Sequence, residues 1–249
     1  MMKGLAYPWE LSAFFLRKFI YLLFLSFFWL AVSRSTEGAL NFRQLIAYFL
    51  LSSAVTNLIF SNSTPFGRYI YRKIRNGELS NFLIKPISTV PFLFFSFIGE
   101  NWMNIFYALI SATIAIIMIP PPGILNVVFF LVFIVLAFFV SFALNILIAT
   151  LSFYFVEVAG IRNSFDHVRT IQSGSLIPLT MFPIMIKQVV MFTPFPLLAF
   201  IPTYTLQNPI QMWETLQMIS ISVAWASGLT VIMSVVWRKS LKKYEGVGI

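Results

Sequence analysis

Long apolar runs constrain the fold of this chain more than any other feature of its sequence. A helix that crosses the hydrocarbon core of a bilayer needs about 17–25 mostly apolar residues. Six stretches approach or meet that requirement: residues 18–33, 43–62, 92–119, 124–150, 163–181 and 212–237. The sequence therefore predicts an all-α, polytopic membrane protein, in which a single transmembrane domain, residues 1–249, carries six transmembrane helices.

The composition agrees with a membrane environment. Hydrophobic residues make up 59% of the chain and charged residues 10%, whereas soluble domains average about 45–50% and about 25%. Cysteine is absent and His167 is the one histidine, so disulfides, thiol catalysis and multi-histidine metal centres are excluded. The G-x-x-x-x-G-K-[ST] pattern is also absent, which excludes ATP hydrolysis by that route. We predict no enzymatic activity, no cofactor and no metal ion on this chain.

The distribution of basic residues predicts the orientation in the membrane. With the N-terminus in the cytosol, only Arg34, Arg43 and Lys187 of the 17 Lys and Arg residues fall on the outer side, as the positive-inside rule requires. The same rule explains the net charge of +9 without nucleic acid as a partner. We expect a multi-pass protein of the plasma membrane, with both termini cytosolic and anionic lipid around the cytosolic face.

The N-terminal segment admits two interpretations. Residues 7–18 combine aromatic side chains with Arg17 and Lys18, a pattern typical of a helix that lies along the membrane surface. The alternative is a cleaved signal peptide, in which this basic pair precedes the apolar residues 19–32. Because about sixteen residues precede the pair and further spans follow it, we expect an interfacial helix and a retained first span.

The polar stretch RKIRNGELSNFLIKP, residues 72–86, lies on the cytosolic side between the second and third predicted spans. Upstream of it, Thr64 and Pro65 are residue types that favour an N-cap and a first helical position. Apolar and basic residues then recur at helical spacing until Asn76-Gly77 supplies a stop. The apolar residues are Phe66, Ile70 and Ile74, and the basic residues are Arg68, Arg72 and Arg75. The pattern predicts a short amphipathic helix, either anchored on the membrane surface or docking a cytosolic partner.

A proline-rich apolar segment, residues 173–209, follows the fifth predicted span. Its prolines stand at positions 178, 183, 194, 196, 202 and 209, too many for one membrane helix, while its apolar character is wrong for an open loop. Irregular backbone at membrane depth is tolerated only where it is buried in protein or lines a cavity. We therefore expect short re-entrant helices on the outer side, against the alternative of an outer loop lying on lipid.

A few polar residues fall inside or near the predicted spans. Glu100 and Asn104 form a candidate polar site, either within the third span or at its cytosolic interface. The interfacial interpretation is favoured if the hydrocarbon span begins near Ile98. Ser141 and Asn145, four residues apart in the fourth span, have the spacing of contacts that pack helices within or between subunits.

Three segments together resemble the membrane subunits (permeases) of ABC transporters of the ABC-2 type, in the branch without a fused ATPase. They are RNGELSNFLIKPIS (residues 75–88), SGSLIPLTMFP (residues 173–183) and the tail WRKSLKKYEGVGI (residues 237–249). Their order and spacing in a six-span frame carry the resemblance, which extends over nearly the whole chain.

The resemblance implies a transport subunit, in this case an exporter, that pairs with itself or with a sister permease. It also implies two cytosolic nucleotide-binding subunits as partners, which hold ATP and magnesium and dock on a coupling helix after the second span. The implied ATPase contacts are Arg68, Arg72, Arg75, Asn76, Gly77 and Glu78. The implied residues of an outer gate on the translocation path are Gly174, Pro178 and Pro183. The alternatives to a transporter are a membrane-embedded enzyme that modifies lipids and a passive channel or scaffold.

Overall fold

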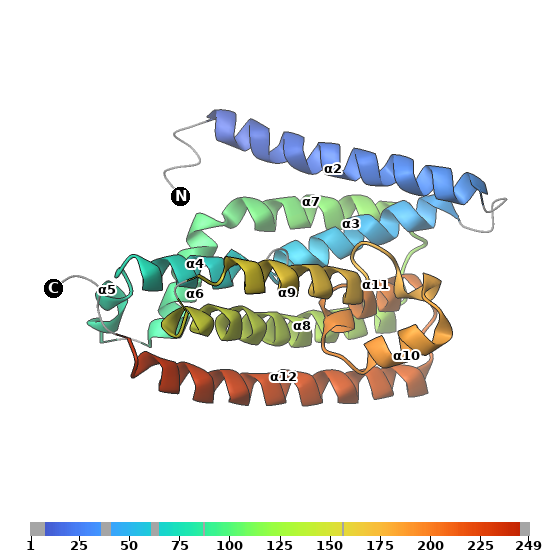
Figure 1. Ribbon diagram of the computed structural model, residues 1–249. Helices are drawn as coiled ribbons and strands as arrows, with labels where there is room; N and C mark the ends of the chain where they lie inside the picture. Colours follow the sequence, from blue (N-terminus) through green and yellow to red (C-terminus); the bar gives the residue numbers. More distant parts are fainter. Residues whose placement is uncertain (1–7, 36–40, 61–64, 87, 156, 245–249) are drawn as a thin grey trace.

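The computed structural model of the protein describes residues 8–35, 41–60, 65–86, 88–155 and 157–244 (Figure 1). These residues form α-helices with short connections and three 3-10 helices, which confirms the all-α class for the described ranges. The α-helices are α2 (Pro8–Ser35), α3 (Phe42–Leu58), α4 (Pro65–Arg75), α5 (Ser80–Leu83), α6 (Thr89–Glu100), α7 (Trp102–Met118), α8 (Ile124–Thr150), α9 (Ala159–Gln172), α10 (Ile184–Met191), α11 (Phe200–Gln207) and α12 (Met212–Leu241). The 3-10 helices are η1 (Leu151–Phe153), η2 (Leu179–Met181) and η3 (Phe195–Leu198).

Three helical segments in the described part of the chain are each long and apolar enough to cross a bilayer: Ser12–Arg34, Ile124–Phe153 and Met212–Leu241. Helices α6 and α7 add a fourth span if the bent pair counts as one. Helix α3, with 17 residues, and α9, with 14, extend about 25 and 21 Å, less than the ~30 Å hydrocarbon core. The structure therefore establishes three or four apolar spans, and the count of six stays a prediction.

Helix α8 lies within the bundle and packs against α4, α11 and α12, while α3 packs along α7 (Figure 1). The fully buried residues Phe133, Ala137 and Val140 recur at helical spacing along one face of α8. Between α4, α6 and α8 the core is aromatic. The ring of Phe66 stacks on Phe142 with centroids 5.5 Å apart and meets Phe97 at 5.2 Å. These contacts fix the position of α4 against the membrane helices.

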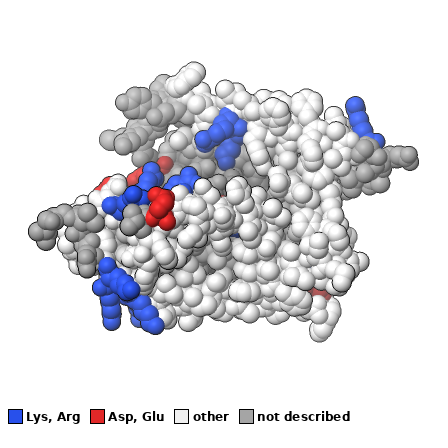
Figure 2. Space-filling model, viewed as in Figure 1, with Lys and Arg blue, Asp and Glu red and all other residues white. Residues whose placement is uncertain are grey.

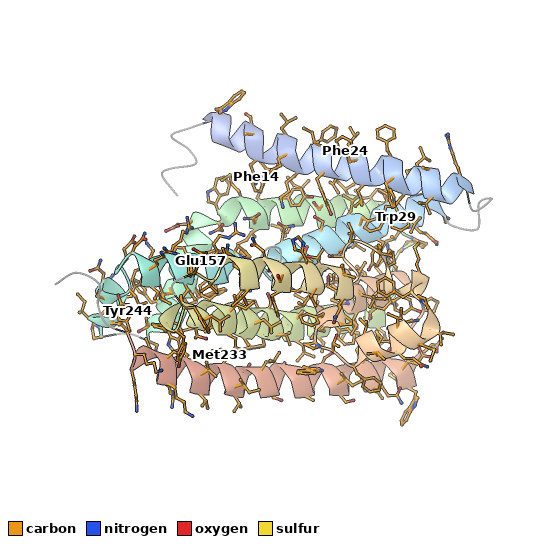
Figure 3. All side chains as sticks on the ribbon, in the orientation of Figure 1. Phe14, Phe24, Trp29, Glu157, Met233 and Tyr244 are labelled. Atoms are coloured by element: carbon orange, nitrogen blue, oxygen red, sulfur yellow. The ribbon has the colours of Figure 1, made fainter. Side chains whose placement is uncertain are left out.

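Helix α2 runs without interruption from Pro8 to Ser35, which corrects the prediction of a separate interfacial helix over residues 7–18. After its first residue α2 contains no glycine or proline, so the sequence has no strong helix breaker there. Trp29 of α2 stacks on Phe49 of α3 with centroids 5.2 Å apart (Figure 3). Most of the other large apolar side chains of α2 are exposed, as expected of a helix that faces lipid.

The predicted third span, residues 92–119, is two helices rather than one. Helix α6 ends at Glu100, and α7 begins after a bend of 67°. Asn101 lies at this bend, and its side-chain amide donates to the carbonyl of Phe97 at 2.9 Å. Side chains that bond the nearby backbone in this way compete with regular helix. A hydropathy average over the whole stretch does not register such a break, because α6 and α7 are both apolar helices.

The predicted fifth span, residues 163–181, also differs from the structure. Helix α9 ends at Gln172, and the chain turns at Gly174, whose φ of +75° lies in the left-handed region. Helices η2, α10, η3 and α11 follow, and α10 and α11 lie at the end of the bundle opposite α4 and α5 (Figure 1). Every residue from 196 to 203 is buried. The part from η3 into α11 is thus packed into the protein, which argues against a loop lying on lipid there, whereas Val190 is the one buried residue of α10.

Charged side chains are segregated along the bundle. The start of α2, helices α4 and α5, and the end of α12 lie at the same end (Figure 1). Figure 2 shows most of the visible Lys and Arg side chains over that half of the molecule and a separate basic group at the opposite end. This separation has the form that the positive-inside rule requires. Which end faces the cytosol stays a prediction.

Candidate docking corner and its supports

Helix α4 presents two different faces. The predicted apolar residues Phe66, Ile70 and Ile74 are buried, at 5% exposure or less, against the neighbouring helices. The three arginines, Arg68, Arg72 and Arg75, are exposed, as the sequence pattern predicted. The predicted helix and its amphipathic pattern are therefore confirmed, whereas Thr64, the predicted N-cap, lies outside the described residues.

The turn after α4 has the predicted geometry. Helix α4 ends at Arg75, and Gly77 has a φ of +72°, a conformation that a side chain would strain. The backbone N–H of Asn76 donates to the Arg72 carbonyl at 3.0 Å, and that of Leu79 donates back across the turn. We call residues 72–80, from the last turn of α4 through this loop, the docking corner.

The carboxylate of Glu78 forms hydrogen bonds with two other residues of the docking corner. It accepts hydrogen bonds from Lys73 Nζ and, at 3.2 Å, from Asn76 Nδ2. These two hydrogen bonds, the one from Lys73 first, hold the pKa of Glu78 below its ordinary value. Both Asn76 and Glu78 were predicted to contact an ATPase. The structure shows that they fix the shape of the loop that follows the arginines of α4, and their contact with an ATPase stays a prediction.

Tyr244, three residues after the end of α12, contacts the docking corner. The hydroxyl of Tyr244 donates to the Gly77 carbonyl at 3.1 Å and lies 3.3 Å from Ser80 Oγ. Its ring meets Phe153 edge-on, with centroids 6.0 Å apart. Sequence reasoning missed Tyr244, because nothing in the basic tail indicates which of its residues returns to a loop so far upstream.

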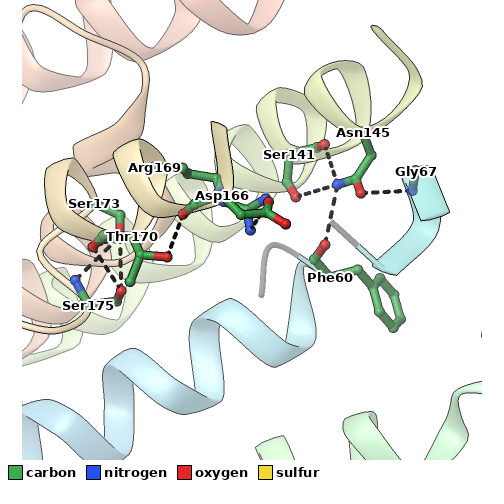
Figure 4. Close-up of polar contacts among 9 residues, drawn as sticks. All are labelled: Phe60, Gly67, Ser141, Asn145, Asp166, Arg169, Thr170, Ser173 and Ser175. Atoms are coloured by element: carbon green, nitrogen blue, oxygen red, sulfur yellow. Dashed lines mark hydrogen bonds and ion pairs between the residues drawn. The ribbon is translucent and has the colours of Figure 1, made fainter. Parts of the chain in front are cut away.

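Asn145 joins α8 to the first turn of α4 (Figure 4). Its Oδ1 accepts the backbone N–H of Gly67 at 2.9 Å, and its Nδ2 donates to the carbonyls of Ser141 and Phe60 at 2.8 and 3.3 Å. A Cβ on Gly67 would lie 2.7 Å from the backbone oxygen of Asn145, so only glycine permits this approach. The packing role predicted for Ser141 and Asn145 is thus confirmed within the chain.

The beginning of α9 also contacts the docking corner. Arg75 Nη1 donates to the Tyr71 hydroxyl at 2.6 Å and lies 3.5 Å from the Glu157 carboxylate. Glu157 in turn accepts the backbone N–H of Ala159 at 3.1 Å, in the first turn of α9. The guanidinium of Arg162 lies 5.8 Å from the centre of the Tyr71 ring. Helix α4 therefore contacts α8 and α9, and its corner also contacts the end of α12.

The far end of α9 meets the predicted gate residues. The Tyr48 hydroxyl donates to the Gly174 carbonyl at 2.7 Å, and the Phe200 N–H donates to the Ser173 carbonyl at 3.0 Å. These bonds join α9 to α3 and α11. Pro178 is also buried, and the next residue, Leu179, lies against Gly174, whereas Pro183 is exposed just before α10. The structure thus brings two of the three predicted gate residues into one packed junction and leaves the third at the surface.

Glu100 and Asn104 lie on either side of the bend between α6 and α7. Glu100 is exposed and lies near Tyr69 of α4. The pKa of Tyr69 is raised to about 12, mainly because the side chain is buried and further because the Glu100 and Glu78 carboxylates are negatively charged. Its position beside α4 favours the interfacial interpretation. Asn104 instead lines a cavity with Lys18. Within the described ranges, no three His, Cys, Asp or Glu side chains are grouped so that they could hold a metal ion.

These features define a multi-pass helical membrane protein in which a short amphipathic helix with a basic exposed face contacts several longer helices. The sequence matches the family model described as "ABC-2 family transporter protein" over residues 7–248. The chain therefore belongs to the ABC-2 transporter family and is a membrane permease of an ABC transporter, a transport component that is not itself catalytic. A search of curated proteins gives no match.

Proposed function

We propose that this permease forms the translocation path of an exporter and docks a separate nucleotide-binding subunit on its docking corner. The partner subunit binds and hydrolyses ATP with magnesium, and the permease pairs with a second copy or with a sister permease. Both termini and the docking corner face the cytosol. Family membership supports the ATP-binding partner, and the resemblance of the motifs supports export.

The docking proposal rests on what the two faces of α4 contact: one face is buried against protein and the other is exposed. A helix that anchors a loop on lipid turns its apolar face to the bilayer and keeps its cations around it. In this chain the apolar face is buried against protein, and the face that is left exposed carries Arg68, Arg72 and Arg75. Such a surface fits a partner with an acidic groove.

The supports of the corner explain how docking can move the membrane helices. A displacement of α4 is transmitted to α8 through Gly67 and Asn145, to α9 through Arg75 and Glu157, and to α12 through Tyr244. Helix α9 extends from this corner to Gly174, where its turn contacts α3 and α11. ATP binding to the partner shifts the permease toward the state in which these contacts are rearranged, because the partner binds that state more tightly.

The docking proposal is tested by combining Arg72→Glu with Arg75→Gln. Arg75→Gln removes a positive charge, whereas a glutamate at position 75 would stand beside the Glu157 carboxylate. Loss of charge-assisted hydrogen bonds worth about 1.5–3 kcal/mol each weakens the complex at least about tenfold. We expect less ATPase subunit to co-purify with the variant from membranes, at an unchanged level of inserted permease.

The matched control is Lys239→Glu with Lys242→Glu, which changes two exposed cations at the end of α12, outside the docking corner. We expect it to retain the ATPase. If the corner variant retains the ATPase and transports as well as the wild type, the corner serves only as a lipid anchor.

A further inference from the structure

A polar cavity of about 460 Å³ lies between α2, α3, α4 and α7, separate from the docking corner. Three of its lining residues are cations, Arg17, Lys18 and Arg68, and the described residues that line it include no carboxylate. Its other walls are aromatic or neutral and polar: Phe14, Tyr21, Ser53, Thr56, Asn57, Phe60, Pro65 and Asn104. Arg17 and Lys18 are neighbours of like charge at this cavity, and an anion bound beside them would lower their mutual repulsion. The lining is therefore complementary to an anion.

Among the described residues, Lys18 contacts neutral groups. Its Nζ donates to Asn57 Oδ1 at 2.9 Å and lies 4.8 Å from the centre of the Tyr107 ring. Asn57 is itself fixed, because its Nδ2 donates to the Ser53 carbonyl at 2.7 Å. These neutral partners orient the ammonium group at the cavity wall. The neighbouring Arg17 has its guanidinium 5.9 Å from the Phe14 ring, another neutral contact.

The depth of the cavity matches that of a lipid headgroup. Lys18 lies 16 positions before Arg34, which is about 24 Å along α2 at about 1.5 Å per residue. The hydrocarbon core is ~30 Å thick, so the two cationic ends of the apolar part of α2 lie near the two interfaces. Arg17 and Lys18 therefore lie at headgroup level, on the side of the bundle that carries α4.

We propose that this cavity binds the phosphate group of an anionic lipid. Arginine and lysine together suit phosphate, because the guanidinium gives paired donors and the ammonium a compact charge. Phe14, Tyr21 and Phe60 supply apolar surface for the carbons next to the phosphate. Both α2 and α4 line the cavity, so the bound lipid fills space between the most lipid-exposed helix and the bundle.

The test uses Arg17→Gln with Lys18→Gln in the full-length permease. Thermal unfolding in detergent is followed during titration with phosphatidylglycerol or phosphatidylcholine, and bound lipid is counted by native mass spectrometry. Ligands that bind the folded state raise the unfolding temperature by mass action. We expect phosphatidylglycerol to stabilise the wild type more than phosphatidylcholine, and the variant to bind phosphatidylglycerol at least about tenfold more weakly.

Three further arms make the result decisive. Lys239→Gln with Lys242→Gln removes two cations at the same end of the molecule but outside the cavity, and should bind like the wild type. Asn104→Trp fills the cavity without changing its charge, and should also weaken binding, so the test survives if the double variant does not fold. Glycerol 3-phosphate distinguishes a soluble phosphate from a lipid. Equal stabilisation by glycerol 3-phosphate, or unchanged phosphatidylglycerol binding in the folded cavity variants, overturns the proposal.

Discussion

The hydroxyl of Tyr244 donates to the carbonyl of Gly77 at 3.1 Å, across 167 positions of the chain. This bond ties the end of α12 to the docking corner at the one residue there whose φ is positive. Because α12 packs along α8, any movement of the corner is opposed by two of the longest helices in the described structure. The geometry of the docking corner therefore depends on a residue near the far end of the chain.

We predict that Tyr244→Phe loosens the corner without unfolding the permease. The change removes one hydrogen bond worth about 0.5–1.5 kcal/mol and keeps the ring on Phe153. Amide hydrogen exchange at residues 76–80 should become several-fold faster. In membranes with the ATPase bound, transport per ATP hydrolysed should fall.

Tyr154→Phe is the matched control for this prediction. It deletes the hydroxyl of the residue that follows Phe153 in the chain, but that hydroxyl accepts from Ser240 Oγ at 3.2 Å rather than contacting the corner. Equal exchange rates at residues 76–80 in both variants would show that Tyr244 acts only through packing.

The docking corner is the part of the site that could be predicted from the sequence, because its signals are local. Apolar residues at helical spacing in α4 and the Asn76-Gly77 stop each act within one or two turns. Local signals did not predict the points at which helices end inside the predicted spans 92–119 and 163–181. Asn101 and Gly174 each change the chain direction inside a stretch that was predicted as one span, and a hydropathy average over the stretch does not register a single residue.

The supports of the corner could not be predicted because they join distant positions. Asn145 was identified as a packing residue from its spacing, yet its partner Gly67 lies 78 positions upstream. For Tyr244 the local sequence carries no signal at all. Contacts of this kind are set by which helices become neighbours, and that follows from the packing of the whole bundle.

We predict that Gly67→Ala destabilises the permease. The added Cβ would lie 2.7 Å from the backbone oxygen of Asn145, so α4 and α8 must separate, which costs about 1–3 kcal/mol as overpacking does. Gly99→Ala is the control, since nothing lies within 4 Å of a Cβ there. Unfolding temperatures in detergent should fall for Gly67→Ala and stay within a degree or two for Gly99→Ala. Equal values for the two variants would contradict the close approach.

The docking corner should lose order at acidic pH. Hydrogen bonds from Lys73 and Asn76 lower the pKa of Glu78 in the folded protein, so their stabilisation is present above the ordinary carboxyl pKa. It is lost as the pH falls through the lowered value. We expect amide exchange at residues 76–80, corrected for its intrinsic pH dependence, to rise as pH falls below about 4.5. Glu78→Gln should abolish this rise, and a persisting rise would assign it to another group.

The predicted topology can be tested with single cysteines, because the native chain contains none. Asn81→Cys places an exposed thiol beside the docking corner, and Ile184→Cys places one at the start of α10. A membrane-impermeant maleimide added to intact cells should label the cysteine at position 184 and leave that at position 81 unlabelled until the cells are opened. The reverse pattern would invert the proposed orientation.

The turn at Gly174 should control transport rather than insertion. Gly174→Leu forces a branched side chain into φ +75° and brings its Cβ within 3.0 Å of the Phe200 Cβ and 3.1 Å of the Tyr48 hydroxyl. The left-handed backbone alone costs a non-glycine residue about 1–2 kcal/mol. Because the contact lies where α9 meets α3 and α11, we expect export to fall at least about tenfold while the amount of inserted protein changes little. Gly228→Leu is the control, because a Cβ there meets nothing within 4 Å, and it should export normally. Wild-type export by the Gly174 variant would show that this junction does not limit transport.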